Sequence, residues 1–210
     1  MSRFGILLGL SMVVAVIFAA PIVHACTGNQ VLLQDNFQNW ASNWGTPDDF
    51  HSVKNGQMVI SPPLGQADIY FSQGNIFNDM SACVDIAVAS GGPKLGYTFA
   101  GIAFWSVDVN NTYYFAVGPS GSYSVARYVA GRFVSIVPWT SNPAVKAGLN
   151  QVNHLRVVTK GGQATLYVND KQVALIDGQP PQGGSEVGLI VQSGPKTRDV
   201  YGFSNLKITN

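Results

Sequence analysis

Short extended segments separated by turn residues recur along most of the chain, and this pattern limits what the sequence can fold into. Asn55-Gly56 separates two extended runs and is the strongest short hairpin signal, because both turn residues must accept a positive φ. Gly161-Gly162 and Asn169-Asp170 mark two further tight turns. After residue 25 no run shows the 3.6-residue period of an amphipathic helix. The pattern predicts about a dozen strands arranged as an antiparallel sandwich or barrel.

The central part of the chain alternates strictly between two kinds of residue, which predicts two different strand faces. One row is bulky and apolar, and we expect it to form the core between two sheets. It consists of Ile102, Phe104, Tyr113, Phe115, Val117, Tyr123 and Val125. The opposite row combines small residues with large aromatic rings: Gly101, Ala103, Trp105, Tyr114, Ala116, Ser124, Ala126 and Tyr128.

Residues 1–25 have the pattern of a secretory signal peptide rather than of a folded segment. Arg3 precedes a continuous apolar run over residues 4–20, and Pro21 then breaks any helix before the small Ala25. An uncleaved anchor is the alternative, but the run is somewhat short for a membrane span, which needs ~20 residues. We therefore expect a secreted or periplasmic protein without a transmembrane segment after cleavage, with residues 26–210 forming one domain.

Two cysteines, Cys26 and Cys83, remain after the signal peptide. In an oxidising compartment an even number of cysteines usually pairs, which predicts a disulfide between them. The alternative is a lipid anchor through Cys26, because Val23-His24-Ala25-Cys26 faintly resembles a bacterial lipobox. His24 fits that motif poorly, so the disulfide is the favoured interpretation.

Charged residues are sparse and balanced, which restricts the class of partner. Twelve Lys and Arg face eleven Asp and Glu, for a formal net charge of +1. A phosphate-binding surface needs an excess of Lys and Arg, so the composition argues against nucleic acid as a partner.

Several segments resemble bacterial concanavalin A-like lectin/glucanase domains: DNF followed by a Trp, then GIAFW, NTYYFAV, GSYSVARYVAGRF, NHLRVV, ATLYVNDKQVA, EVGLIV and FSNLKI. That superfamily includes laminin-G-like modules and the group labelled as 3-keto-disaccharide hydrolase domains. The resemblance covers nearly the whole chain after residue 25 and lies mostly in strand-forming residues. It implies an all-β jelly-roll sandwich of two curved antiparallel sheets, whose concave face in relatives often holds sugars. Fold by itself does not determine activity.

Residues for glycoside hydrolysis are not evident in the sequence. Laminarinase-like enzymes of this fold carry a Glu-x-Asp-x-x-Glu strand, whereas Glu186 is the single glutamate of this chain. Glycosidases need two carboxylates at a set separation. Asp85 is expected at a solvent-facing or edge position, and His154 as a hydrogen-bonded residue at the end of a strand. The sequence favours a non-catalytic carbohydrate-binding or surface-interaction module; the alternative is a glycan-active hydrolase or lyase of the 3-keto-disaccharide hydrolase type.

No metal or other cofactor is expected, because His51 and His154 lie far apart in sequence and no spacing typical of a metal site occurs. Structural calcium is the alternative, since the oxygen-rich segment at residues 108–111 suits a hard cation. The resembled family often ends on Phe-Asp-Asn, where this chain has Ser204 in the middle position, and that departure removes one candidate ligand.

Aromatic residues of the central strands are the best candidates for a binding site, because the C–H faces of sugars pack on aromatic rings. We predict that Trp105 and Tyr114 stack against a carbohydrate or cell-surface glycan, with Tyr128 and Arg127 at the rim and Trp139 nearby. The alternative is that these rings fill the interior of the sandwich. For Trp139, which follows Pro138, that alternative is the favoured one.

Overall fold

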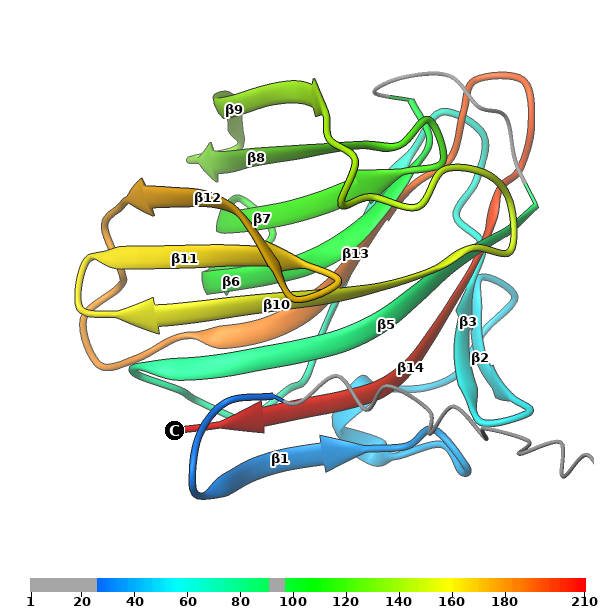
Figure 1. The fold of residues 1–210 in the computed structure, drawn as a ribbon. Coiled ribbons are helices and arrows are strands. Elements are labelled where there is room, and N and C mark those ends of the chain that lie inside the picture. Colours follow the sequence, from blue (N-terminus) through cyan, green and yellow to red (C-terminus); the bar gives the residue numbers. More distant parts are fainter. Residues whose placement is uncertain (1–25, 91–96) are drawn as a thin grey trace, which may run out of the picture.

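Two antiparallel sheets stacked face to face make up the fold, as the resemblance implies (Figure 1). The computed structural model describes residues 26–90 and 97–210. In that part of the chain the elements are fourteen β-strands and one short 3₁₀ turn, η1 (Ser42–Trp44). The prediction of an all-β jelly-roll sandwich is confirmed. The expected signal peptide at residues 1–25 lies outside the described residues.

The larger layer, which we call the large sheet, has β14 and β5 at its centre. Its spatial order is β12 (Lys171–Asp177), β11 (Gln163–Val168), β10 (Val152–Lys160), β5 (Met80–Ser90), β14 (Val200–Thr209), β3 (Gln57–Ile60) and β2 (His51–Lys54). One more strand, β1 (Val31–Asp35), also pairs with β14, so the first and last strands of the described chain are neighbours (Figure 1).

The second layer, which we call the small sheet, contains the central meander. Its spatial order is β4 (Ala67–Phe71), β13 (Glu186–Gln192), β6 (Phe99–Asp108), β7 (Asn111–Gly118), β8 (Ser122–Val129) and β9 (Arg132–Ser141). β6 to β9 follow one another in sequence and in space, whereas β4 and β13 come from distant segments. β9 is an edge strand of this sheet.

Tight turns form where the turn residues predict them. Asn55 and Gly56, which join β2 to β3, have φ angles of 54° and 72°. Asn169 and Asp170, which join β11 to β12, have φ angles of 49° and 64°. Two consecutive positive φ angles are typical of the hairpin turns whose twist matches that of antiparallel strands.

The core lies between the two sheets and contains the bulky row predicted from the alternation of the meander. Ile102, Phe104 and Phe115 are fully buried there. The large sheet contributes the facing layer, which includes Val84, Ile86, Leu155, Val157, Leu166, Phe203 and Ile208. The opposite row of the meander forms a separate apolar cluster around Phe99 and Tyr114 on the other face of the small sheet.

Trp105 is the exception to the alternation, and the prediction that it shares a face with Tyr114 is wrong. The pairing of β6 with β7 shifts register after Phe104, and Trp105 has a φ of 48°. Such a bulge re-aims the side chains that follow it. The indole consequently belongs to the core between the sheets, 4% exposed, with its ring centroid 5.2 Å from that of Tyr113.

Gly178 covers this indole from the connection that follows β12. A Cβ atom at Gly178 would lie 2.3 Å from the six-membered ring of Trp105. The backbone can pass this close only because the residue has no side chain.

The predicted disulfide between Cys26 and Cys83 is confirmed. Cys83 lies in β5 near the centre of the large sheet, so the bond fastens the segment before β1 to that sheet. A sulfur bonded to Cys83 cannot also carry a thioether-linked lipid. The structure therefore favours the disulfide over a lipid anchor at Cys26.

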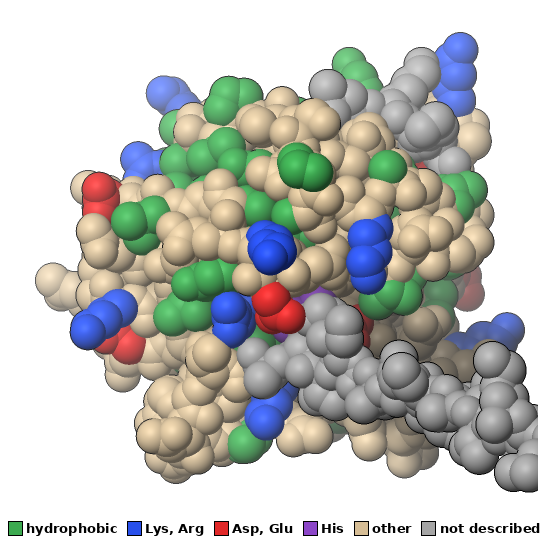
Figure 2. Space-filling model, viewed as in Figure 1, with side chains coloured by type: hydrophobic (Ala, Val, Ile, Leu, Met, Phe, Trp, Pro, Cys, Tyr) green, Lys and Arg blue, Asp and Glu red, His purple; other side chains and the backbone are tan. Residues whose placement is uncertain are grey.

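Charged side chains are dispersed over the face of the molecule shown in Figure 2, with apolar and uncharged polar surface between them. No single-sign patch of the kind that binds phosphate backbones dominates this face. In the described residues, no helix has the length and apolar character required to cross a membrane.

Removing the disulfide is expected to lower the free energy of unfolding by about 2–4 kcal/mol, because the bond restricts a long loop in the unfolded chain. The variant to compare with the wild type is Cys26→Ser/Cys83→Ser, unfolded in urea at constant temperature. The wild type after reduction serves as its control and should match the double variant. Equal stability of the oxidised wild type and the double variant would contradict the expectation.

Replacing Trp105 by alanine is expected to cost about 3–5 kcal/mol of stability, as for other large buried aromatic residues. Phe133→Ala is the matched control, because Phe133 lies in the same sheet but is 57% exposed. Its loss should be about 1 kcal/mol or less. Urea unfolding of both variants measures the difference, and a Trp105→Ala variant as stable as Phe133→Ala would show that the indole is not a core residue.

Candidate functional site

Three of the predicted ligand-binding residues, Tyr114, Tyr128 and Trp139, meet on the face of the small sheet that points away from the large sheet. Together with Phe99 and Phe133 they form a continuous row of rings, which we call the aromatic strip. Its neighbouring ring centroids are 5.4 Å apart for Trp139 and Phe99, 5.8 Å for Phe99 and Tyr114, 6.2 Å for Tyr114 and Tyr128, and 6.0 Å for Tyr128 and Phe133. These spacings are typical of favourable aromatic pairs.

The middle and the ends of the aromatic strip differ in exposure. Phe99 and Tyr114 are 3% and 4% exposed, so they form its floor. Tyr128 and Trp139 are half-buried and Phe133 is exposed, so these three rings are open to a ligand. The strands between them carry small side chains on the same face: Gly101, Ala103, Ala116, Ser124 and Ala126.

The two tyrosines of the strip keep their hydroxyl protons over the neutral pH range. Burial raises the pKa of Tyr114, and the neighbouring Tyr128 raises it further. Burial also raises the pKa of Tyr128. A neutral phenol can donate a hydrogen bond as well as accept one, so the half-buried Tyr128 can pair with a ligand hydroxyl.

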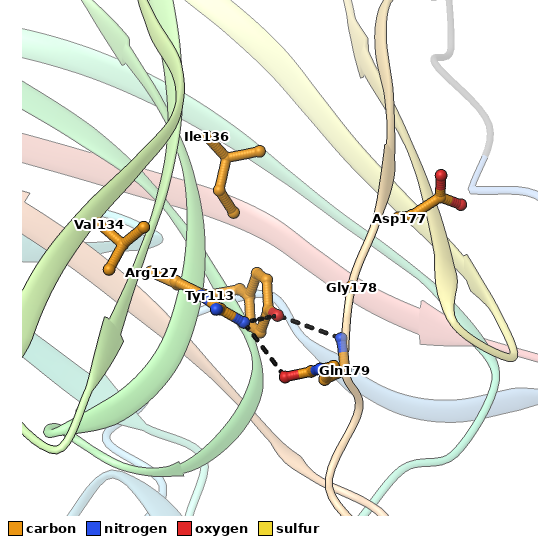
Figure 3. Close-up of a pocket in the computed structure, with 7 residues that line it drawn as sticks. All are labelled: Tyr113, Arg127, Val134, Ile136, Asp177, Gly178 and Gln179. Carbon is orange, nitrogen blue, oxygen red and sulfur yellow. Dashed lines mark hydrogen bonds between the residues drawn. The ribbon is translucent and has the colours of Figure 1, made fainter.

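Arg127 points to the opposite face of the small sheet, contrary to the prediction that it lies at the rim of the same site (Figure 3). It stands between Ala126 and Tyr128 in β8, and successive side chains of a strand alternate. Its strand partner on β7 is Tyr113, whose ring belongs to the core. Arg127 and Trp105 therefore lie on one face of the meander, and the aromatic strip lies on the other.

Arg127 lines a cavity of about 390 Å³ between the meander and the connection that follows β12 (Figure 3). Its Nη1 donates a hydrogen bond to the hydroxyl of Tyr113 at 2.7 Å, and the backbone N–H of Gln179 donates to the same oxygen at 3.1 Å. The Oε1 of Gln179 accepts a longer bond from Nη1, at 3.5 Å. Sequence reasoning did not place Tyr113 and Gln179 beside Arg127, because Gln179 comes from a distant connection.

A polar cluster that sequence reasoning missed lies on the outer face of the large sheet. His154 on β10 is the strand partner of Asp85 on β5, and its Nδ1 lies 2.7 Å from the Oδ1 of Asp85. Asn205 on β14 donates from Nδ2 to the other carboxylate oxygen of Asp85 at 2.8 Å. A histidine oriented by a carboxylate is a common arrangement for proton transfer. The cluster depends on the register of β10, β5 and β14, which the amino-acid sequence alone does not specify.

His51 makes a second contact of this kind at the edge of the large sheet. Its Nδ1 lies 2.7 Å from the Oδ1 of Asp48, and its ring packs on those of Tyr70 and Trp40. Burial raises the pKa of Asp48, but hydrogen bonds from the backbone of Phe50 and His51 and the His51 ring outweigh it and lower that pKa overall. The carboxylate of Asp48 is therefore held in its charged form.

Glu186 and Asp108 line one cavity of about 350 Å³ at the junction of β13 and β6. Asp108 also accepts hydrogen bonds from the backbone of Asn110 and the side chain of Asn111, which closes the turn considered for calcium. Across residues 26–90 and 97–210, no three His, Cys, Asp or Glu side chains are grouped to hold a metal ion.

Several solved structures are similar to this sandwich in fold. It is similar to the carbohydrate-binding module CBM66 from Bacillus subtilis, with a TM-score of 0.63 and 16% identity over 78% of this chain and 92% of that one. It is also similar to the β-glucanase of Bacillus licheniformis, with a TM-score of 0.58 and 11% identity over 88% of this chain and 100% of that one. For the carbohydrate recognition domain of Emp47p the TM-score is 0.62 and the identity 15%, over 85% of this chain and 94% of that one. At these identities the likeness shows the fold alone.

Among curated protein sequences none matches the chain significantly. A family model does match, and it extends over residues 29–209, from just before β1 to the end of β14. That span includes the aromatic strip, the cavity at Arg127 and both histidine–aspartate contacts. The chain belongs to the family of 3-keto-α-glucoside-1,2-lyase-like domains.

Proposed function

We propose that this domain binds carbohydrate without turning it over and that the aromatic strip is its binding surface. The observation that carries the proposal is the unbroken row of rings on the face of the small sheet opposite the core. An apolar patch that leaves Phe133 exposed and Tyr128 and Trp139 partly exposed is typical of a surface that binds a partner. Sugars fit such a row because they present both apolar C–H faces and hydroxyls.

Tyr128, Phe133 and Trp139 are the residues through which a glycan would make contact. Tyr128 and Phe133 lie at one end of the strip and Trp139 at the other, so a ligand that touches both ends passes over the buried ring of Tyr114. The small side chains of the surrounding strands leave room for the sugar rings. Because the surface offers few charged groups, we expect a dissociation constant on the order of 1 μM to 1 mM.

The comparisons support the carbohydrate part of this proposal through the names of related structures, which include a carbohydrate-binding module and a carbohydrate recognition domain. The non-catalytic part rests on the sequence, in which Glu186 is the single glutamate.

A lyase or hydrolase is the second candidate, and two observations favour it. The family model is described as 3-keto-α-glucoside-1,2-lyase-like. The contact of His154 with Asp85 supplies an oriented imidazole of the kind that removes a proton in an elimination, and Glu186 shares a cavity with Asp108. The outcome of an activity assay separates this candidate from a pure binding module.

Trp139→Ala and Tyr128→Ala are each expected to weaken binding about tenfold, which corresponds to about 1.4 kcal/mol. The ligand is chosen by screening the mature protein on a glycan array, and the affinity is measured by calorimetric titration. Tyr167→Ala is the matched control, because Tyr167 is a half-buried ring on the large sheet, stacked under Arg156. Unchanged affinity in both strip variants, with loss in Tyr167→Ala, would move the binding surface to the large sheet.

Incubation of the protein with laminarin, lichenan or a 3-keto-glucoside is expected to release no new reducing ends and no elimination product. The physical reason is that a glycosidase needs two carboxylates at a set separation, and the chain lacks the Glu-x-Asp-x-x-Glu strand that supplies such a pair in laminarinase-like enzymes. Product analysis by chromatography measures the outcome. New reducing ends that disappear in Glu186→Gln would establish a hydrolase, and an elimination product that disappears in His154→Gln would establish a lyase.

A further inference from the structure

The cavity at Arg127 is separate from the aromatic strip and has the dimensions of a small-molecule site. Its volume of about 390 Å³ falls within the range of about 300–1,000 Å³ that such sites occupy. Tyr113, Arg127, Val134 and Ile136 of the meander form one wall, and residues 177–179 after β12 form the other. The proposed function does not use this cavity, because its lining side chains point away from the strip.

Hydrogen bonds from one nitrogen atom, Nη1, hold the guanidinium of Arg127 in place. The edge formed by its other two nitrogen atoms remains available to a ligand. Among the described residues its hydrogen bonds all leave from Nη1, to the hydroxyl of Tyr113 and to Gln179. The group also lies over the ring of Tyr113, 5.5 Å from the centroid. The Nε and Nη2 atoms are therefore the pair that can bind a planar carboxylate through two parallel hydrogen bonds.

The hydroxyl of Tyr113 adds a second donor to the same place. Its oxygen accepts hydrogen bonds from Arg127 and from the backbone N–H of Gln179, which occupies both lone pairs. In the part of the chain that the structure describes, the hydroxyl hydrogen of Tyr113 is not donated to any hydrogen bond. A phenol that already accepts two hydrogen bonds is left to donate, so Tyr113 and Arg127 both favour an acceptor that carries negative charge.

The rest of the cavity suits a sugar ring rather than a bare anion. Val134 and Ile136 provide apolar surface against which a C–H face can pack. The carboxylate of Asp177 accepts a 3.0 Å hydrogen bond from Gln163 and points away from the other lining residues in Figure 3, so it does not face a ligand. The side-chain amide of Gln179 lies beside Arg127 and is the group that can pair with ring hydroxyls.

From this arrangement we infer that the cavity binds a hexuronic acid, with the sugar carboxylate on Arg127 and Tyr113, the ring hydroxyls toward Gln179 and a C–H face on Val134 and Ile136. A neutral hexose would leave the open edge of the guanidinium unpaired. Inorganic phosphate or acetate would not use the apolar wall of Val134 and Ile136. The inference is independent of the aromatic strip, so either site can fail without the other.

The test is a titration of the isotopically labelled full chain with glucuronate, followed by NMR, with glucose and acetate as matched ligands. We expect the Nε–H resonance of Arg127 to shift on addition of glucuronate, and the affinity for glucuronate to exceed that for glucose by about tenfold or more. Equal affinity for glucose, or for acetate, overturns the inference. The wild-type titration does not depend on the folding of any variant.

Variants then assign the contact to Arg127. Arg127→Gln should abolish the preference for glucuronate over glucose, and Arg127→Lys should lose most of it because a lysine cannot form the paired hydrogen bonds. Arg132→Gln is the control, because Arg132 is an exposed arginine of the same hairpin and does not line the cavity. An equal loss in Arg132→Gln would show that overall charge, rather than this site, selects the acid. Trp139→Ala should leave glucuronate binding unchanged, and a loss there would overturn the independence of the two sites.

Discussion

The burial of one face of β6, β7 and β8 against the large sheet is the constraint on which the other features depend. It fixes Ile102, Phe115 and Val125 in the core, and strand geometry then assigns every intervening side chain to the opposite face. Neighbours in sequence consequently serve different surfaces. Tyr113 contributes to the cavity at Arg127, and Tyr114, the next residue, forms the floor of the aromatic strip.

The aromatic strip and the cavity at Arg127 thus lie on opposite faces of the same four-stranded meander. The strip offers aromatic surface with neutral hydroxyls, and the cavity offers a guanidinium with an apolar wall. The two surfaces cannot exchange residues without a change of register, because a shift of one residue would turn every side chain over. Substitutions on one face should therefore act on that face alone, unless they disturb the core between them.

The strand and turn pattern predicted a sandwich or barrel, and the alternation predicted the core row and the grouping of Tyr114 with Tyr128, whereas the jelly roll was implied by the family resemblance. The alternation failed at Trp105, because a bulge adds a residue to the strand and a bulge has no local signature in this segment. It could not predict the contact of His154 with Asp85 either, since that contact depends on how β10 and β5 align. Sites built within one meander can be predicted from a sequence, and sites built across distant strands require the three-dimensional pairing.

The position of β14 has a consequence for the order in which this chain can fold. The last strand pairs with β1, β3 and β5, so it is the piece that joins three early segments into one sheet. Synthesis begins at the other end, so β14 emerges after all three strands with which it pairs. Until β14 pairs, β1 has no strand partner among the described residues, and one edge of β5 lacks its hydrogen-bonded neighbour. Pairings over such sequence distances make folding slow, so β1 and one edge of β5 stay open to aggregation until the ten residues of β14 are available.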